Sequence, residues 1–535
     1  MSVETASSSS SAFGFGRRFA RGCLLGLTLV ITGCAAEAAV REPAAPPTPA
    51  PVARAETPQR APEPPATTAA TTTAEPAATT PETKKPDASE DARAKLVAWL
   101  KKEMPAGGEV VDEPGKPVGV VHVAKKGELY ELIARHYVEL TDIYLTADLF
   151  KELRKVNKVK VSEAREGERV VIPAIVSAAP KSADDERLGW PEDKVLRGVY
   201  VRGGPAASHL YEEILQESAR RGMNLIVLDA KDYDGWVTYP SKVPLANESG
   251  ATKNAPIRNL ARTIRFAHKY GVRVAVRIAC FEDEILAKFR GDLSVQAKWG
   301  KPYKIGWLDP YVDGAQSYVI DLAKEAMDAG ADEIQLDYVR YPVLGIKGAD
   351  FKIEERNTTK VEVITKFVRR VHEVTKARNV KLSLDVFGVI AEGKRIDIDM
   401  LGQDPAMLAP ECDALSPMVY PSHYSVGYRG FQNPGNHPEI VGYGTKGTID
   451  QIRAGGVTGG AVIRPWLQGM SYKQDNFSPK YVGDQMKSSE ANGAHGWLIW
   501  NPGQGYAATW SALPPKEDKS RLAAGAETPR AKGEK

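Results

Sequence analysis

From residue 196 onward the chain alternates short apolar runs, rich in β-branched residues, with stretches whose apolar positions follow a helical period. An uninterrupted apolar run of about four to eight residues is typical of a strand buried on both faces. Such strands, when they alternate with amphipathic helices, indicate a parallel sheet covered by helices. The predicted strands are 198–201, 225–228, 272–278, 333–336, 381–386, 415–420, 461–466 and 497–500. The predicted helices are 210–221, 257–270, 315–329, 360–376, 448–454 and 480–491.

Eight strands spread over about three hundred residues favour a closed barrel over an open sheet. An open doubly wound sheet usually has a glycine-rich phosphate-binding turn after its first strand. The first predicted strand is followed by Arg202-Gly203-Gly204-Pro205-Ala206, which lacks that pattern. We therefore predict an α/β protein whose main domain, residues 194–513, is a (β/α)8 TIM barrel.

The two ends of the chain lack any core-forming pattern. Residues 34–90 are almost entirely Ala, Pro, Thr and Glu, a composition that buries too little apolar surface to offset the chain entropy lost on folding. We predict a disordered, semi-extended tether there, followed by a short helix at 91–104. The charged, Ala-rich tail 514–535 is also predicted to be disordered.

The first 33 residues have the layout of a secretory signal, in which arginines precede a short apolar run. The run ends in Ile31-Thr32-Gly33-Cys34, which resembles the bacterial lipobox. That resemblance implies lipidation of Cys34 and an exported protein anchored in the membrane of the bacterial cell envelope. A plain signal peptide or a short membrane anchor is the alternative. Of the cysteines that would then remain, Cys280 and Cys412 are predicted to be free and buried.

Residues 120–174 have the pattern of a small separate domain. The segment begins Val121-His122-Val123-Ala124-Lys125-Lys126-Gly127 and ends Gly167-Glu168-Arg169-Val170-Val171-Ile172-Pro173, with Leu149, Leu153 and Asn157 between. It resembles a lysin motif (LysM), in which two helices lie between two strands. The resemblance implies a small α+β domain, here 91–180 with the preceding helix, and a glycan partner such as peptidoglycan. A structural spacer is the alternative. The sequence departs from the family in Leu129, where Thr is usual, and in an insertion at 138–148.

The charge balance and the spacing of the cysteines argue against a nucleic-acid partner and a metal site. The chain has 71 lysines and arginines against 68 aspartates and glutamates, a net charge of +3. Nucleic-acid binders usually concentrate basic charge, so no nucleic-acid partner is expected. The spacing and neighbours of the cysteines suggest no metal, and no cofactor is expected.

Three aspartates follow predicted strands at the end of the barrel where function gathers in this fold: Asp229, Asp337 and Asp385. Glycoside hydrolysis normally needs two carboxyl groups across the scissile bond. Adjacent strands lie about 5 Å apart, so Asp337 and Asp385 are predicted to bracket such a bond, with one of them protonated near neutral pH. The alternatives are an ion pair that closes the barrel mouth for Asp337 and a loop cap for Asp385.

Aromatic and arginine side chains lie at or near the carboxyl ends of these and of the other predicted strands. Tyrosine and tryptophan offer flat apolar faces to sugar rings, and arginine holds a neighbouring carboxylate ionised and oriented. The alternative for the aromatic residues is packing at the barrel rim. The predicted substrate-binding residues are Tyr338, Arg340, Tyr341, Arg277, Tyr420, Arg464, Trp466 and Trp500.

The barrel segment resembles a bacterial family of glycosidase-like barrels with unassigned substrates. The resemblance rests mainly on Asp337-Tyr338-Val339-Arg340-Tyr341-Pro342, on 417–424 and on the closing Gly496-Trp497-Leu498-Ile499-Trp500-Asn501. It implies the fold and the superfamily more than an activity. The chain departs from the α-amylase pattern, because Gln335 replaces an arginine two residues before Asp337, and Asp385 replaces a glutamate.

Three functional hypotheses follow. The first is a glycoside hydrolase acting on an envelope or extracellular polysaccharide. The second is a carbohydrate-binding or scaffold lipoprotein whose barrel is inactive, because a fold alone does not establish a function. The third, a phosphate-using barrel enzyme, would need a glycine-rich loop after strand seven or eight. The glycine-rich stretch 455–460 precedes strand seven, which places it at the other end of the barrel.

Overall fold

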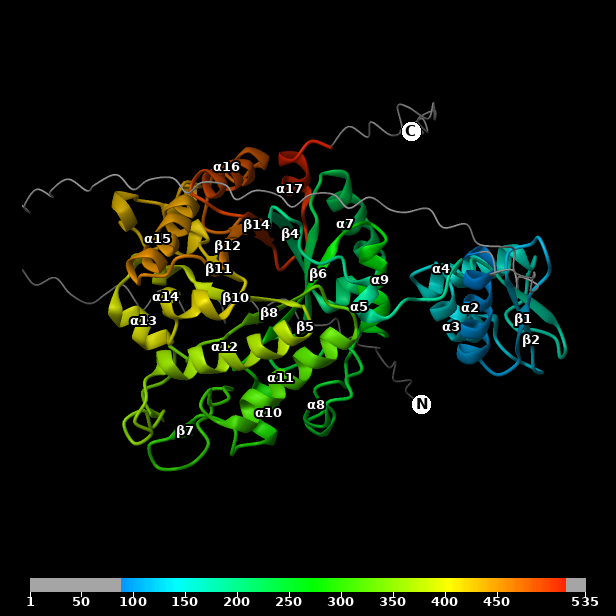
Figure 1. Ribbon diagram of the computed structural model, residues 1–535, viewed down its shortest axis with the longest axis horizontal. Coiled ribbons are helices and arrows are strands. Elements are labelled where there is room, and N and C mark those ends of the chain that lie inside the picture. Colours follow the sequence, from blue (N-terminus) through cyan, green and yellow to red (C-terminus); the bar gives the residue numbers. More distant parts are fainter. Residues whose placement is uncertain (1–87, 516–535) are drawn as a thin grey trace, which may run out of the picture.

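The computed structural model describes residues 88–515, which form a small N-terminal domain and a large barrel, each with its own apolar core (Figure 1). The predicted signal sequence, lipidation at Cys34, most of the tether and the C-terminal tail from residue 516 lie outside the described residues. Within 88–515, no helix combines the length and apolarity that a membrane span requires.

The small domain is an antiparallel sheet of order β1-β2-β3 packed against helices. Its elements are α2 (Ala88–Glu103), β1 (Gly108–Val111), β2 (Gly119–Val123), α3 (Tyr130–Tyr137), η1 (Val138–Leu140), α4 (Thr146–Val156) and β3 (Arg169–Ile172). The order β2-α3-α4-β3 is the predicted strand–helix–helix–strand unit. Helix α4 buries Leu149 and Leu153, which lie four residues apart on one helical face, so the sequence period sets the face that packs on the sheet.

The segment between α3 and α4 fastens the small domain to the barrel. The Tyr144 ring stacks on Phe266, with 4.4 Å between ring centroids, and its hydroxyl donates to the Ala206 carbonyl at 2.5 Å. The Arg262 guanidinium donates to the carbonyls of Tyr144 and Ile143. The insertion predicted at 138–148 therefore acts as a docking segment.

The large domain is a closed barrel of parallel strands. The strands are β4 (Leu196–Val201), β5 (Leu225–Lys231), β6 (Arg273–Ala279), β8 (Glu333–Asp337), β10 (Lys381–Phe387), β11 (Ala414–Met418), β12 (Val462–Ile463), β13 (Trp466–Gln468) and β14 (Gly496–Trp500). Their order is β10-β8-β6-β5-β4-β14-β13-β11-β12, and a β10–β11 pairing closes the ring. Strands β12 and β13 both pair with β11 and share the seventh position, so the predicted eightfold (β/α) barrel is confirmed.

Helices surround the barrel, and the residues that they bury explain their positions (Figure 1). The main ones are α7 (His209–Arg220), α9 (Leu260–His268), α11 (Asp313–Asp328), α12 (Lys360–Ala377), α15 (Ile440–Ala454) and α16 (Pro479–Ala491). The shorter ones are α5 (Ala183–Glu186), α6 (Gly203–Ala206), α8 (Pro244–Glu248), α10 (Glu284–Phe289), α13 (Arg395–Leu401), α14 (Pro405–Leu408) and α17 (Ala507–Ala512). A short antiparallel pair of β7 (Gln296–Ala297) and β9 (Ala349–Asp350) joins the long loops after β6 and β8. Helix α12 starts with a capping box of Thr359 and Glu362, which satisfies two amides at its first turn.

A polar cluster fills the barrel interior near the amino ends of the strands. Glu333, the first residue of β8, accepts hydrogen bonds from Arg464, from Ser383 at 2.5 Å and from Trp190 at 2.9 Å. Arg464 and Glu333 are both fully buried, so each charge depends on the other for compensation. Cys280 and Cys412 are buried and free, as predicted.

Candidate functional site

At the carboxyl ends of the strands, one guanidinium links two of the predicted aspartates. Arg277 on β6 donates from Nε and Nη2 to Oδ2 of Asp337 on β8, at 3.0 and 2.7 Å. Its Nη1 donates to Oδ1 of Asp229 on β5. The register explains the contact with Asp229, because Arg277 lies directly opposite that residue across the β5–β6 pair. Arg277 is 2% exposed, so it is a fixed positive charge between two carboxylates.

The other oxygen of Asp337 is held by the backbone. The Tyr338 amide donates to Asp337 Oδ1 at 2.6 Å, and Tyr338 has a φ of +51°, in the left-handed region that side chains other than glycine rarely adopt. Such backbone strain persists only where the surrounding structure enforces it, and it clusters at functional sites. Both oxygens of Asp337 therefore accept hydrogen bonds, and its side chain keeps 10% exposure.

Asp385 on β10 lies in the same compartment but has different partners. Its Oδ1 accepts hydrogen bonds from Gln335 at 2.5 Å and from the Trp466 indole at 2.6 Å, and not from an arginine. Burial, and then the negative charge of Asp337, raise its pKa well above the ordinary range of an aspartate. The two central aspartates thus differ: Asp337 has a cation against it, whereas burial and the neighbouring negative charge favour the protonated form of Asp385.

Asp229 lies deeper than Asp337. It is 1% exposed, and its Oδ2 accepts a hydrogen bond from the Tyr200 hydroxyl. Burial raises its pKa to about 7, with Asp232 adding to the rise and Arg277 opposing it. This geometry supports a role in orienting Arg277 more than direct contact with a substrate.

Aromatic rings surround the arginine and the aspartates. Tyr200 and Trp500 lie with their ring centroids 4.2 Å apart, and the Arg277 guanidinium lies 5.7 and 5.8 Å from the two centroids. Trp466 meets Trp500 edge to face at 5.8 Å. Tyr420 is buried in the same interior cluster as Trp466. These rings give the site an apolar lining, and among the predicted aromatic residues Trp466, Trp500 and Tyr420 lie together.

The remaining predicted residues fall into two groups. Arg340 and Tyr338 lie at the site: the Arg340 guanidinium is 4.7 Å from the Trp307 ring centroid and 5.3 Å from that of Tyr338. Tyr341 and Arg464 lie elsewhere. Tyr341 is fully buried against Phe351, and Arg464 points toward the amino ends of the strands, where Glu333 holds it. The geometry gives neither of these two a route to a ligand at the carboxyl ends.

The family to which this barrel belongs is established by its sequence. A family model described as "Putative glycosyl hydrolase domain" matches residues 198–506. The chain belongs to this family. The matched residues include all of the aspartates described above, so the site lies inside the glycosyl hydrolase domain.

Several solved structures are similar to parts of the chain. A hypothetical protein from Ruminiclostridium thermocellum ATCC 27405 is 32% identical, over 35% of this chain and 97% of that chain, with a TM-score of 0.32. The PgaB (BpsB) glycoside hydrolase domain from Bordetella bronchiseptica is 12% identical, over 58% and 95%, with a TM-score of 0.43. The Bacillus megaterium QM B1551 spore cortex-lytic enzyme SleL is 11% identical, over 74% and 85%, with a TM-score of 0.36. No curated protein matches the chain.

The glycosyl hydrolase domain also contains site residues that the sequence did not single out. Tyr200 and Gln335 bind Asp229 and Asp385, and Glu282 lies near Arg340, with 4.0 Å between Oε2 and Nη2. Asp283, next to Glu282, is fully buried, caps α10 and pairs with Lys231. Position after β6 alone does not distinguish Glu282 from Asp283, because only the path of the loop decides which of the two carboxyls reaches the mouth.

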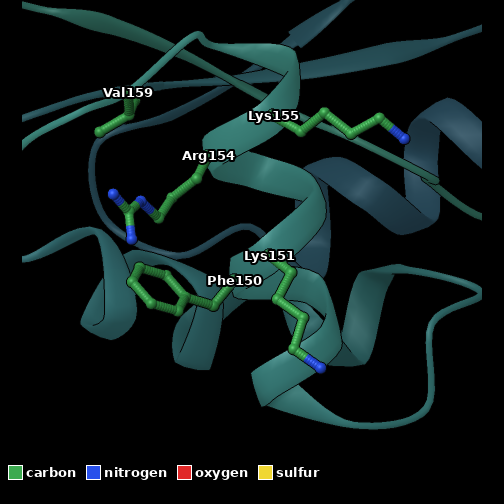
Figure 2. Close-up of a pocket in the computed structure, with 5 residues that line it drawn as sticks. All are labelled: Phe150, Lys151, Arg154, Lys155 and Val159. Atoms are coloured by element: carbon green, nitrogen blue, oxygen red, sulfur yellow. The ribbon is translucent and has the colours of Figure 1, made fainter.

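The small domain contributes a separate hollow, of about 340 Å³, along α4 (Figure 2). Its lining consists of Phe150, Lys151, Arg154, Lys155 and Val159. Figure 2 shows Arg154 and Phe150 on the same side of the helix, and the guanidinium lies 5.6 Å from the ring centroid. The hollow therefore combines an apolar ring with positive charge.

Proposed function

We propose that the barrel is a glycoside hydrolase that acts on an envelope or extracellular polysaccharide through paired carboxyl groups. The observation that carries the proposal is the contrast at the carboxyl ends of the strands. Asp337 is held by Arg277, whereas Asp385 beside it is buried with a pKa raised by that burial and by Asp337. One ionised and one protonated carboxyl are what glycosidic bond cleavage requires. The family match supports the same class of reaction.

In this mechanism the Asp337 carboxylate acts on the anomeric carbon directly or through a water molecule that it deprotonates, and a protonated carboxyl protonates the departing oxygen. Arg277 and the Tyr338 amide fix the orientation of Asp337. Trp500 and Tyr338 offer ring faces to sugars. Asp337 and Asp385 are paired in this proposal because they lie on neighbouring strands. Asp229 accepts a hydrogen bond from Arg277 and so helps to orient it.

Replacement of Asp337 tests the proposal. The purified protein is assayed for release of reducing ends from peptidoglycan, chitin and bacterial exopolysaccharides. The Asp337→Asn variant is expected to lose more than about 10³-fold in kcat/KM on the polysaccharide that is cleaved, because the amide neither attacks nor activates water. Its affinity for that polysaccharide should stay within a few-fold. Binding without turnover in the unmodified protein would support the carbohydrate-binding alternative and contradict the proposal.

We also propose that the small domain binds a glycan such as peptidoglycan and that lipid on Cys34 holds the exported protein in the cell envelope. The strand–helix–helix–strand unit and the hollow lined by Phe150 and Arg154 support the first part. The lipobox-like Ile31-Thr32-Gly33-Cys34 supports the second. Co-sedimentation of the full chain with insoluble peptidoglycan tests the glycan binding.

A further inference from the structure

The loop that leaves β6 runs along the end of β8. Ala279 pairs in register with Asp337, and the Cys280 amide donates to the Asp337 carbonyl at 2.8 Å. Two residues later, Glu282 forms a β-bridge with Trp307, which fixes its backbone above the strand ends. Its carboxyl group faces Arg340, which lies three residues beyond Asp337 on the neighbouring loop. The chain therefore carries a further acidic group to the end of the barrel at which Asp337 lies.

Glu282 and Asp385 differ in access to the mouth. The Glu282 side chain is 29% exposed, whereas Asp385 is 1% exposed and has one oxygen held by both Gln335 and Trp466. A proton donor must come within hydrogen-bonding distance of the leaving oxygen of a bulky sugar. Glu282 is the more accessible of the two carboxyl groups, whereas the Asp385 side chain is enclosed by the barrel interior.

Building on the proposed function, we propose that Glu282 takes the role of general acid, which strand position alone would give to Asp385, and that Asp385 is a positioning residue. The proton on the Glu282 carboxyl passes to the glycosidic oxygen, and the electron pair of the breaking carbon–oxygen bond stays on that oxygen. The new bond to the anomeric carbon is formed by an Asp337 carboxylate oxygen or by a water molecule that Asp337 deprotonates. In the first case Glu282, now ionised, deprotonates the water that releases the sugar, and in both cases water supplies the new hydroxyl.

The charges around Glu282 suit this role. Burial raises its pKa to about 7. Arg340 and Lys231 oppose the rise, while Asp337 and Asp232 add to it. A carboxyl group with a pKa near 7 is protonated in a large fraction of molecules at neutral pH and still releases its proton readily, which is the optimum for general acid catalysis.

The test compares substrates that differ in their need for a proton. Glu282→Gln and Glu282→Ala are assayed on the polysaccharide cleaved in the panel and, for the first turnover, on 2,4-dinitrophenyl glycosides of glucose, galactose and N-acetylglucosamine. Dinitrophenolate leaves without protonation. Both variants should therefore lose about 10²- to 10⁴-fold on the polysaccharide and less than about tenfold on the dinitrophenyl glycoside that the unmodified protein cleaves. Glu284→Gln, an exposed neighbour paired with Lys288, is the matched control and should keep both activities.

Other outcomes overturn the inference while leaving the proposed function standing. Equal losses on both substrates would show a structural role for Glu282, and unchanged cleavage of the polysaccharide would show no role. The selective pattern in Asp385→Asn, with Glu282→Gln unaffected, would assign the acid to Asp385. An unmodified protein that cleaves none of the polysaccharides or glycosides would instead remove the proposed function, and the inference with it.

Discussion

Among the single residues, Arg277 is central to the site, because its guanidinium distributes hydrogen bonds between two carboxylates. Arg277 gives two hydrogen bonds to Asp337 and one to Asp229, all out of contact with bulk water. A guanidinium suits this task because its donors are planar and fixed in direction, which a lysine ammonium cannot reproduce. Asp229 consequently sets the angle at which Arg277 reaches Asp337.

The raised pKa of Asp229 predicts a pH dependence of stability. An acid whose pKa is about 7 in the folded protein, against about 4 unfolded, stabilises the fold below pH 4, and this contribution is lost as the pH rises from about 4 to 7. Its upper size is about 4 kcal/mol. Asp229→Asn imitates the protonated form, so the variant should lose less stability over that pH interval. Urea unfolding of both proteins at pH 4, 5.5 and 7 measures the free energy of unfolding. An equal loss of this free energy in the two proteins over that pH range would contradict the prediction.

At the level of helices and loops, the segment between α3 and α4 connects the small domain to the barrel. Tyr144 contacts Phe266, Ala206 and Thr263, and Glu139 accepts a hydrogen bond from Asn259 at 3.0 Å. Asn259 also caps α9 by accepting the Arg262 amide. The docking segment thus lies along α9, from Asn259 at its start to Lys269 at its end, where Lys269 pairs with Asp142.

Replacement of Tyr144 should uncouple the two domains. Tyr144→Ala removes a stacked ring and a hydrogen bond to the barrel, and it should weaken the docking by about 3 kcal/mol. Scanning calorimetry should then show the small domain unfolding at a lower temperature than the barrel. Hydrolysis of a dinitrophenyl glycoside should not change, because Tyr144 does not contact the site. Thr146→Ala serves as a milder control, since that hydroxyl accepts a hydrogen bond from the exposed side chain of Arg258. An unaltered single transition in Tyr144→Ala would rule out the docking role.

At the scale of the whole molecule, the proposed arrangement places a catalytic barrel and a glycan-binding domain on one anchor. Both domains would act on the same polymer, and the docking segment would hold their relative orientation. A binding domain joined to the barrel raises the local concentration of substrate, provided that one polysaccharide chain reaches both sites.

The anchor gives a prediction in cells. Cys34→Ala should remove the site of lipid attachment, and the protein should move from the membrane fraction to the soluble fraction and lose incorporation of labelled palmitate. Cys23→Ala is the matched control, because it alters a cysteine within the predicted signal sequence and should leave fractionation unchanged. Palmitate labelling that persists in Cys34→Ala would disprove lipidation at this residue.

The amino-acid sequence was enough to predict the strands of the barrel and the end of the barrel at which the acidic residues gather. Apolar runs and helical periods are local signals, and parallel strands place their carboxyl ends on one side. The sequence also indicated Asp337, Asp385 and Arg277, which the structure brings to one end, although their catalytic roles stay predictions. It missed the break at Arg464-Pro465 that splits the seventh strand into β12 and β13.

The partner of each side chain, in contrast, depends on the folded arrangement of the barrel. Arg464 and Arg277 both lie in barrel strands, yet one points to Glu333 at the amino ends and the other to Asp337 at the carboxyl ends. Glu282 and Asp283 are neighbours in the chain, yet one is partly exposed and faces Arg340 and the other is buried against Lys231. These side-chain directions depend on the stagger of the strands in a closed barrel and on the paths of the loops. Both arise from contacts between residues far apart in the chain.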